Sequence, residues 1–257
     1  MIKYHLYLLF SFFRGIMKFT QSYKVKFHDT NSNELLGASG VLKLMQETGM
    51  LHMDFARPSY RDLLNQDKAL ILSSIRINMY SPISAHDEVV VTTWATGSRG
   101  FTTYRSFQIH RGEELLAEAN TIWALVSVSE KKLVKISEVD FSNFQPEPQL
   151  ELDAPSKVRI PSELKLSLVG EYTVRYTDTD LNMHVSNTNY PDMFFNYLPS
   201  PEKKIVKSVA ICYVNDAKAG DNLKFYMGKT DGKYYMRSVH EDGRVNAEVE
   251  FITETLG

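Results

Sequence analysis

The sequence predicts an α+β protein made of two tandem units, each an antiparallel sheet wrapped around one helix. Three observations predict it: an internal repeat, a helical stretch early in each copy, and segments of alternating polarity after each helix. Tyr and Phe, with 14 residues each, add to the preference for strands. The chain of 257 residues is long enough for two units of about 125 residues each.

The internal repeat sets the boundaries of the two units. Residues 25–33 (VKFHDTNSN) match residues 174–182 (VRYTDTDLN) at an offset of 149. Residues 74–91 match residues 208–225 at an offset of 134, and a later Ala-Glu pair recurs at an offset of 130. The order is kept while the offsets shrink, as expected for a second copy with shorter loops.

Each copy is expected to contain a short strand with a D-T-x-x-N turn, then a helix, then a meander of strands. In the first copy the helix is predicted from Ala38 to Phe55 and the strands at residues 71–80, 88–95, 102–110 and 115–128. In the second copy the helix is predicted at residues 189–198 and the strands at 205–215, 222–228, 233–240 and 244–253.

Four prolines between residues 140 and 163 break regular structure, so this segment is predicted to be a linker over the surface. It separates a first domain, residues 17–139, from a second, residues 164–257. Residues 1–16 are predicted to be an extension outside the fold, before a start at Met17. Their apolar run of about ten residues is too short to span a bilayer, although a signal, an anchor or a packed segment remains an alternative.

Composition excludes several classes of protein and partner. With 43% hydrophobic and 23% charged residues, the chain is neither disordered nor fibrous. Its single cysteine, Cys212, excludes an internal disulfide and fits a reducing compartment, which predicts a cytoplasmic protein. The formal net charge of −2 gives no basis for binding nucleic acid. No stretch is apolar enough to predict membrane insertion, and no His, Cys or Asp cluster has metal-ligand spacing.

The second copy carries three proton-handling groups that the first copy lacks: Asp180, His184 and Asp216. The matched positions of the first copy hold Asn31, Leu35 and Pro82. A duplication that keeps a full polar set in one copy predicts one active site and one supporting half.

The polar positions of the second copy also alternate along the chain. In an extended segment, one face would carry Asp178, Asp180, Asn182 and His184. Asp178 recurs in the first copy as Asp29, which favours a structural role in a turn. Asn182 also recurs, as Asn33, but is kept as a candidate because its carboxamide can both donate and accept.

The pattern D-x-D-x-N-x-H-V-x-N at residues 178–187 resembles the acyl-[acyl carrier protein] thioesterases, a family of two tandem hotdog domains. The resemblance covers nearly the whole chain from Met17 and includes residues 37–52. It implies hydrolysis of fatty acyl-[acyl carrier protein] to free fatty acid, which ends chain elongation in fatty acid biosynthesis. The first domain would bind the acyl chain and the second would be catalytic, with acyl carrier protein as partner and no cofactor. An acyl-CoA thioesterase and a non-catalytic acyl-binding module remain alternatives, and a further homodimer is left open.

By this resemblance, the family's catalytic Asp, Asn and His fall on Asp180, Asn182 and His184. Asp216 takes the place of a downstream acidic residue of the family. Ala217 stands where plant members have a cysteine, which argues against a cysteine nucleophile. The chain's own cysteine is expected to be a packed apolar residue.

Thioester hydrolysis needs an activated water, a stabilised oxyanion and a proton for the leaving thiol. We expect Asp216 or Asp180 to be the general base, and His184 to hold the water or protonate the thiolate. Asn182 would orient the water or the thioester carbonyl. Backbone N–H groups after Asn187 are expected to bind the oxyanion.

The resemblance places the acyl slot in the first domain, beside the helix. Methionines fill irregular cavities, so candidates for its wall are Met45, Met50 and Met53. Acyl carrier protein is acidic and should dock on basic residues; the candidates near the site in sequence are Lys203, Lys204, Lys207 and Lys218. An ordinary helix core and a solvated face are the alternative interpretations of these two groups.

Overall fold

The computed structural model describes residues 17–152 and 157–256, so the predictions for residues 1–16 lie outside the described residues. The first half contains two helices, α1 (Ala38–Ala56) and α2 (Tyr60–Asn65). Its strands are β1 (Phe19–Lys24), β2 (Lys68–Met79), β3 (Glu88–Arg99), β4 (Thr102–Arg111), β5 (Glu114–Ser127) and β6 (Lys132–Leu133).

The second half repeats this order with a much shorter helix. A 3₁₀ turn, η4 (Asn187–Asn189), leads into α3 (Tyr190–Phe195). The strands are β7 (Ser167–Thr173), β8 (Lys204–Tyr213), β9 (Asn222–Thr230), β10 (Lys233–His240) and β11 (Val245–Thr255). The helix predicted at residues 189–198 ends at Phe195, and Pro199, which disfavours helical backbone at Leu198 just before it, keeps the helix from continuing beyond that point.

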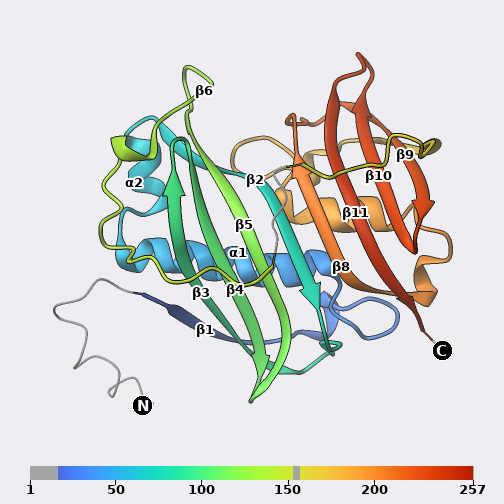
Figure 1. Cartoon of the computed structure of the whole chain (residues 1–257), viewed down its shortest axis with the longest axis horizontal. Helices are drawn as coiled ribbons and strands as arrows, with labels where there is room; N and C mark the ends of the chain where they lie inside the picture. The colour runs from blue at the N-terminus through green and yellow to red at the C-terminus, as the bar shows by residue number, and fades with distance from the viewer. Residues whose placement is uncertain (1–16, 153–156, 257) are drawn as a thin grey trace.

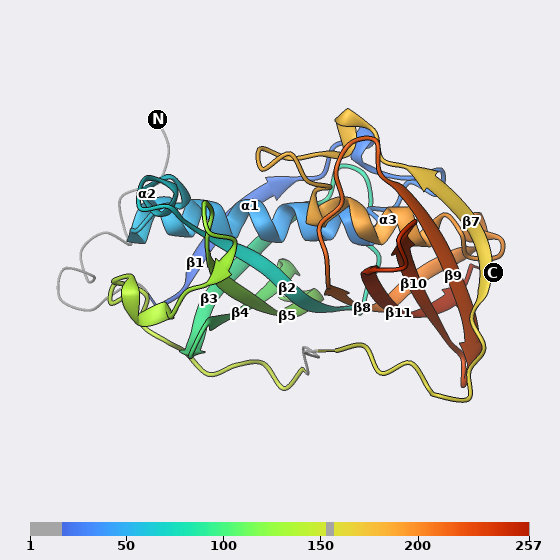
Figure 2. The same ribbon diagram turned by 90° about the horizontal axis from the view of Figure 1, so that it is seen from above.

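All these strands form one antiparallel sheet in the order β1-β3-β4-β5-β2-β8-β11-β10-β9-β7, with β6 paired to β5. The halves meet where β2 pairs with β8, from Ser74 opposite Cys212 to Asn78 opposite Ser208. Figure 1 shows the sheet in front of α1 and α3, and Figure 2 shows both helices on the same side of it. The α+β prediction of two sheets wrapped on helices is confirmed, and the two sheets are continuous.

Matched hydrogen bonds confirm the internal repeat. The bridge Thr30–Leu36 recurs as Thr179–Val185, and the bridge Leu35–Ser84 recurs as His184–Lys218. The first pair keeps the offset of 149 on both sides, and the second combines the offsets of 149 and 134 read from the sequence. The two halves therefore share the turn after their first strand and the way this turn contacts the start of the next hairpin.

Helix α1 carries the core of the first half. Its buried face includes Val41, Leu42, Met45 and Gly49, and the core continues across the β2–β8 join into the second half. Met45 is fully buried in this core and, unlike Met50 and Met53, is not among the residues that line the cavity described below. Phe107 of β4 packs beside Gly49 of the helix, where an added Cβ would lie in ordinary van der Waals contact, 3.6 Å from the Phe107 ring.

The linker packs against the open face of the sheet (Figure 2). The Asn120 amide of β5 donates to the carbonyls of Leu150 and Leu152. Further on, Val158 packs with Cys212 and Tyr235. Cys212 is buried there, which confirms the expected packed side chain, and burial raises the pKa of its thiol to about 11. No helix among the described residues is both long and apolar enough to cross a membrane.

Candidate active site

The candidate residues lie on a tight turn, and the predicted extended segment is wrong. After η3 (Tyr176–Asp178), the Oδ1 of Asp180 accepts the backbone N–H of Asn182 at 2.8 Å. The N–H of Asp180 donates to the carbonyl of His184 at 2.9 Å, and Met183 between them has φ = 62°. An aspartate that bonds to the backbone two residues on closes a turn, so the polar side chains do not share one face.

Asp178 is held on the other side of this turn. Its Oδ2 accepts the Tyr172 hydroxyl and the Arg175 N–H, each at 2.7 Å. Both contacts lie within the second half and fix the start of the loop. The structural role predicted for Asp178 is confirmed, and it is not grouped with the candidate residues.

His184 and Asp216 form a pair beside the turn. The Nε2 of His184 lies 2.8 Å from the Oδ2 of Asp216, and the two side chains are 37% and 53% exposed. The backbone bridge between His184 and Lys218 sets this contact, because it places residue 184 against the segment that carries Asp216. With Asp216 accepting from Nε2–H, the Nδ1 of His184 is the nitrogen that takes or gives a proton.

Asn182 is held from the other half of the chain. Its Oδ1 accepts the Tyr60 hydroxyl at 3.1 Å, which orients the carboxamide so that Nδ2 is the free donor. Tyr60 begins α2, whose capping box joins Ser59 and Asp62. Burial raises the pKa of Tyr60, so the hydroxyl stays protonated and donates. The sequence analysis missed Tyr60, although S-x-x-D at residues 59–62 marks a helix start.

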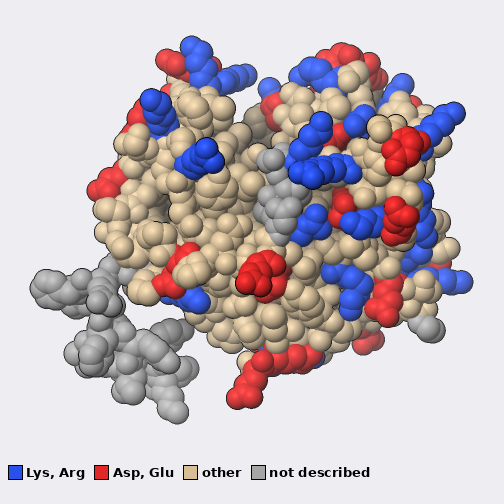
Figure 3. Space-filling view, in the orientation of Figure 1, with Lys and Arg blue, Asp and Glu red and all other residues tan. Residues whose placement is uncertain are grey.

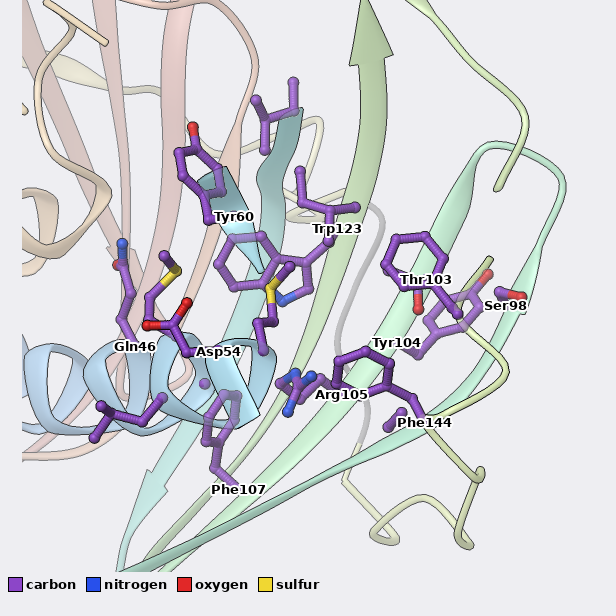
Figure 4. A pocket seen from close by; sticks show the side chains of 18 of the residues that line it. Gln46, Asp54, Tyr60, Ser98, Thr103, Tyr104, Arg105, Phe107, Trp123 and Phe144 are labelled. Carbon is purple, nitrogen blue, oxygen red and sulfur yellow. The ribbon is translucent and has the colours of Figure 1, made fainter. Parts of the chain in front are cut away.

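A cavity of about 640 Å³ opens next to Asn182 (Figure 4). The first half supplies most of its wall from α1 and the strands β2 to β5. Its apolar lining includes Met50, Met53, Leu70, Phe107 and Trp123. The second half contributes Asp180, Leu181, Asn182 and Asn187. Met50 and Met53 thus line the cavity as predicted, and the turn of the second half closes one end of it.

The four predicted site residues therefore fall into two pairs. Asp180 and Asn182 line the cavity, whereas His184 and Asp216 are not among its lining residues and form their ion pair at the surface. The turn connects the pairs through the hydrogen bond from Asp180 to the His184 carbonyl. A ligand that enters the cavity along this turn would pass the His184–Asp216 pair before it reaches Asn182.

A half-buried cation lies on the cavity wall. The Nη1 of Arg105 on β4 contacts His52 Nδ1 at 2.9 Å and Thr93 Oγ1 at 3.2 Å. Burial, and then the charge of Arg105, lowers the pKa of His52 to about 3, so the imidazole is neutral and Nδ1 accepts. Burial lowers the pKa of Arg105 to about 10, which leaves it charged at neutral pH.

The predicted lysine patch is not one surface. Lys203 and Lys204 lie at the start of β8, and Asp216 follows the end of this ten-residue strand, roughly 30 Å away. Lys218 alone of the four adjoins the site, through its bridge to His184. The prediction grouped these lysines by their closeness in the sequence, but the extended strand β8 separates the residues at its two ends. Figure 3 shows Lys and Arg gathered over the second-half strands on the open face of the sheet, opposite the helices.

A second cavity lies at the matching place beside the first-half turn, which lacks counterparts of Asp180, His184 and Asp216. It measures about 690 Å³ and lies between the first-half turn, with Asn31 and Asn33, and α3 of the second half. Leu35 stands there in place of His184. Among the described residues, no three His, Cys, Asp or Glu side chains are close enough to hold a metal ion.

Two models of one family match the chain. The acyl-ACP thioesterase N-terminal domain matches residues 16–142, and the acyl-ACP thioesterase C-terminal domain matches residues 162–253. The chain belongs to the acyl-ACP thioesterase family. Among curated members, it is 19% identical over 196 residues to a palmitoyl-acyl carrier protein thioesterase of Gossypium hirsutum and 22% identical over 185 residues to an acyl-[acyl-carrier-protein] hydrolase of Cuphea viscosissima.

These matches cover 71% and 67% of this chain but 48% and 45% of the plant proteins, so the chain spans about half the length of its curated relatives. Solved thioesterases share its fold over nearly their whole length. An acyl-ACP thioesterase of Bacteroides thetaiotaomicron has a TM-score of 0.84 at 17% identity, over 92% of this chain and 98% of its own. A 12:0-ACP thioesterase of Umbellularia californica has 0.80 at 16%, over 93% and 97%. The two tandem domains of this family member are therefore hotdog domains.

Proposed function

We propose that the protein hydrolyses the thioester of fatty acyl-[acyl carrier protein] and releases free fatty acid. The observation that carries the proposal is the apolar cavity of the first half, which ends at Asp180 and Asn182 of the second half. An acyl chain in this cavity would place its thioester at these polar groups. Family membership supports the same reaction.

Asp180 is the general base in this proposal. The matched Asn31 accepts the N–H groups of Asn33 and Leu35 and so closes the first-half turn without a charge. The turn therefore needs a side-chain oxygen but no carboxylate, which leaves the negative charge of Asp180 for chemistry. Because Asp180 lines the cavity, its second oxygen can take a proton from a water that attacks the carbonyl carbon.

Asn182 stabilises the carbonyl in this scheme. With Oδ1 fixed by Tyr60, its Nδ2 donates to the thioester oxygen, where negative charge develops in the tetrahedral intermediate. Asn187, which begins η4 and also lines the cavity, places backbone N–H groups near the same oxygen.

His184 and Asp216 serve the leaving group. They lie at the surface beside the turn, where the carrier's thiol would be. Collapse of the intermediate breaks the C–S bond, and His184, oriented by Asp216, gives its proton to the thiolate. The proton taken from water by Asp180 returns to His184 through solvent, so one water is consumed and one acid and one thiol are formed.

A direct assay tests the proposal. Purified protein is given acyl carrier protein and CoA thioesters over a series of chain lengths, and His184→Ala is compared with Leu35→Ala, its match in the first half. We expect hydrolysis of the carrier-protein thioesters, a loss of about 100-fold or more in kcat for His184→Ala, and little loss for Leu35→Ala. Hydrolysis of CoA thioesters alone favours the acyl-CoA alternative, and binding without turnover favours the acyl-binding module.

Docking of the acidic carrier is assigned to the surface around Lys218. This residue is exposed and its backbone bridges to His184. Lys218→Glu should raise KM for acyl carrier protein thioesters and not for CoA thioesters. Lys203→Glu, at the far end of β8, is the matched control, and an equal effect of both variants would contradict this assignment.

Three further points of the proposal stay predictions. The domain boundaries at residues 139 and 164 are tested by limited proteolysis within the linker. The cytoplasmic location is tested by cell fractionation, and assembly into a homodimer by light scattering.

A further inference from the structure

Arg105 keeps hydrogen-bond donors that no described residue uses. Both of its polar contacts, to His52 and Thr93, are made by Nη1. A guanidinium has five N–H donors, so the donors on Nε and Nη2 have no partner among residues 17–152 and 157–256. Arg105 is half-buried and lines the cavity, and neither atom is among the fully buried side-chain atoms without a partner, so these donors are open to a molecule that fills the cavity.

Arg105 also lacks a counter-ion in the described part of the chain. None of the ion pairs there includes it. Three acidic residues share the cavity lining, namely Glu47, Asp54 and Asp180, but none lies within ion-pair distance of Arg105. The guanidinium also lies over the Phe144 ring, 5.8 Å from its centroid, and this contact leaves its charge without an anionic partner and available to a ligand.

The cavity changes character along its length. Met50, Met53 and Trp123 form an apolar middle. Figure 4 shows Tyr60, which marks the Asn182 end, separated from Arg105 by Trp123. Beside Arg105 the hairpin of β3 and β4 adds further polar lining from Ser98, Thr103 and Tyr104. An acyl chain that starts at Asn182 would cross the apolar middle and meet donors at its remote end.

We propose that the cavity selects acyl chains that carry a neutral oxygen, a hydroxyl or a carbonyl, near the end remote from the thioester, and that this oxygen accepts a hydrogen bond from Arg105. The inference rests on the proposed function and names its substrate class. A chain that ends in a methyl group would cover the guanidinium without satisfying its donors.

The experiment compares acyl carrier protein thioesters of equal chain length, one series ending in a methyl group and one in a hydroxymethyl group. We expect kcat/KM to be about tenfold or more higher for the hydroxylated chain, because hydrogen bonds to charged groups are among the stronger ones. Arg105→Met keeps the apolar stem and removes the donors, so it should lower kcat/KM for the hydroxylated chain and raise it for the methyl-ended chain.

Arg105→Lys should retain part of the preference, since one charged donor remains. Arg99→Gln, an exposed arginine on the same hairpin, is the control and should leave the preference intact. The proposal is overturned if the unmodified protein prefers the methyl-ended chain, or if the preference survives in Arg105→Met. Thermal unfolding checks that each variant folds, and if Arg105→Met does not fold, the unmodified protein and Arg105→Lys decide the matter.

Failure of this inference is distinguishable from failure of the proposed function. Turnover of methyl-ended thioesters without selection of the hydroxylated ones leaves the proposed function standing and refutes the role of Arg105. If nothing is hydrolysed, calorimetric binding of the free fatty acid and its hydroxylated analogue still tests the cavity. Equal affinities would then overturn the inference.

Discussion

The turn of the first half is closed by Asn31, whose Oδ1 accepts the N–H of Asn33 at 2.9 Å. The turn of the second half is closed by Asp180 in the same way, at 2.8 Å. The residue before the last position of each turn has a left-handed backbone, with φ of 59° at Glu34 and 62° at Met183. The backbones are thus alike, and the difference lies in the side chains they present.

The helices of the two halves differ in length. Helix α1 has 19 residues and lines the apolar cavity beside the second-half turn, whereas α3 has six residues and lines the matching cavity beside the first-half turn. In the proposed function, the first half supplies most of the binding wall and the second half supplies the reactive turn. The comparison teaches that the duplicated units share a scaffold but have divided the work between helix and turn.

The substitution Asp180→Asn tests this comparison most directly, because it gives the second-half turn the asparagine that the first-half turn has at Asn31. The amide still accepts the Asn182 N–H, so the fold should be kept, while kcat falls about 10² to 10⁴-fold because the base is lost. Steady-state kinetics and thermal unfolding measure the two effects. Asn31→Asp is the reciprocal control, and similar kinetics for both variants would mean that the two turns are functionally equal.

Asp216→Asn tests the pair that the first half lacks. An amide holds His184 less strongly than a carboxylate, so kcat should fall about tenfold with little change in KM. Asp231→Asn, on an exposed turn of the same half, is the control. A wild-type kcat in Asp216→Asn would remove Asp216 from the proposed mechanism.

Tyr60→Phe probes the contact between the halves and should have a smaller effect. Losing one neutral hydrogen bond should lower kcat a few-fold at nearly constant KM, because Asn182 is less well oriented. In an Asn182→Ala background the same change should have no further effect, since the partner is gone. Additive effects would show that Tyr60 acts independently of Asn182.

His52 lies near the end of α1 and should make the stability of the fold depend on pH. Its pKa is 6.5 in the unfolded chain and about 3 in the fold. Between these values the unfolded chain binds a proton that the folded chain does not, so stability falls as pH drops from 6.5 toward 3. The slope from this residue is at most about 1.4 kcal/mol per pH unit.

Urea unfolding over this pH range measures that slope. His52→Gln should flatten it, whereas His28→Gln, at an exposed position, should not. If the slope is the same in His52→Gln, the pH dependence comes from other groups, and the buried His52–Arg105 contact does not set it.

Much of this architecture is local and was therefore predictable. Turns and strands are determined by short stretches of sequence, so the repeated segments form the same bridges in both halves, at the offsets of 149 and 134. For the site, the sequence predicted which residues take part but not how they are arranged. A turn at Asp180 stands where an extended segment was expected. The contact between Tyr60 and Asn182 joins residues 122 positions apart in the sequence, so it depends on how the two halves are placed against each other.

The join between β2 and β8 rests mainly on main-chain hydrogen bonds, which do not depend on side-chain identity, and the side-chain contacts of Ser208 with Asn78 and of Arg76 with Ser208 are the ones that recombined halves would have to keep. Halves from diverged relatives should therefore recombine: a chimera cut in the linker would inherit chain selection from the parent of its helix and reactivity from the parent of its turn. The pairing of β2 with β8 would then complete the sheet between halves that come from different family members.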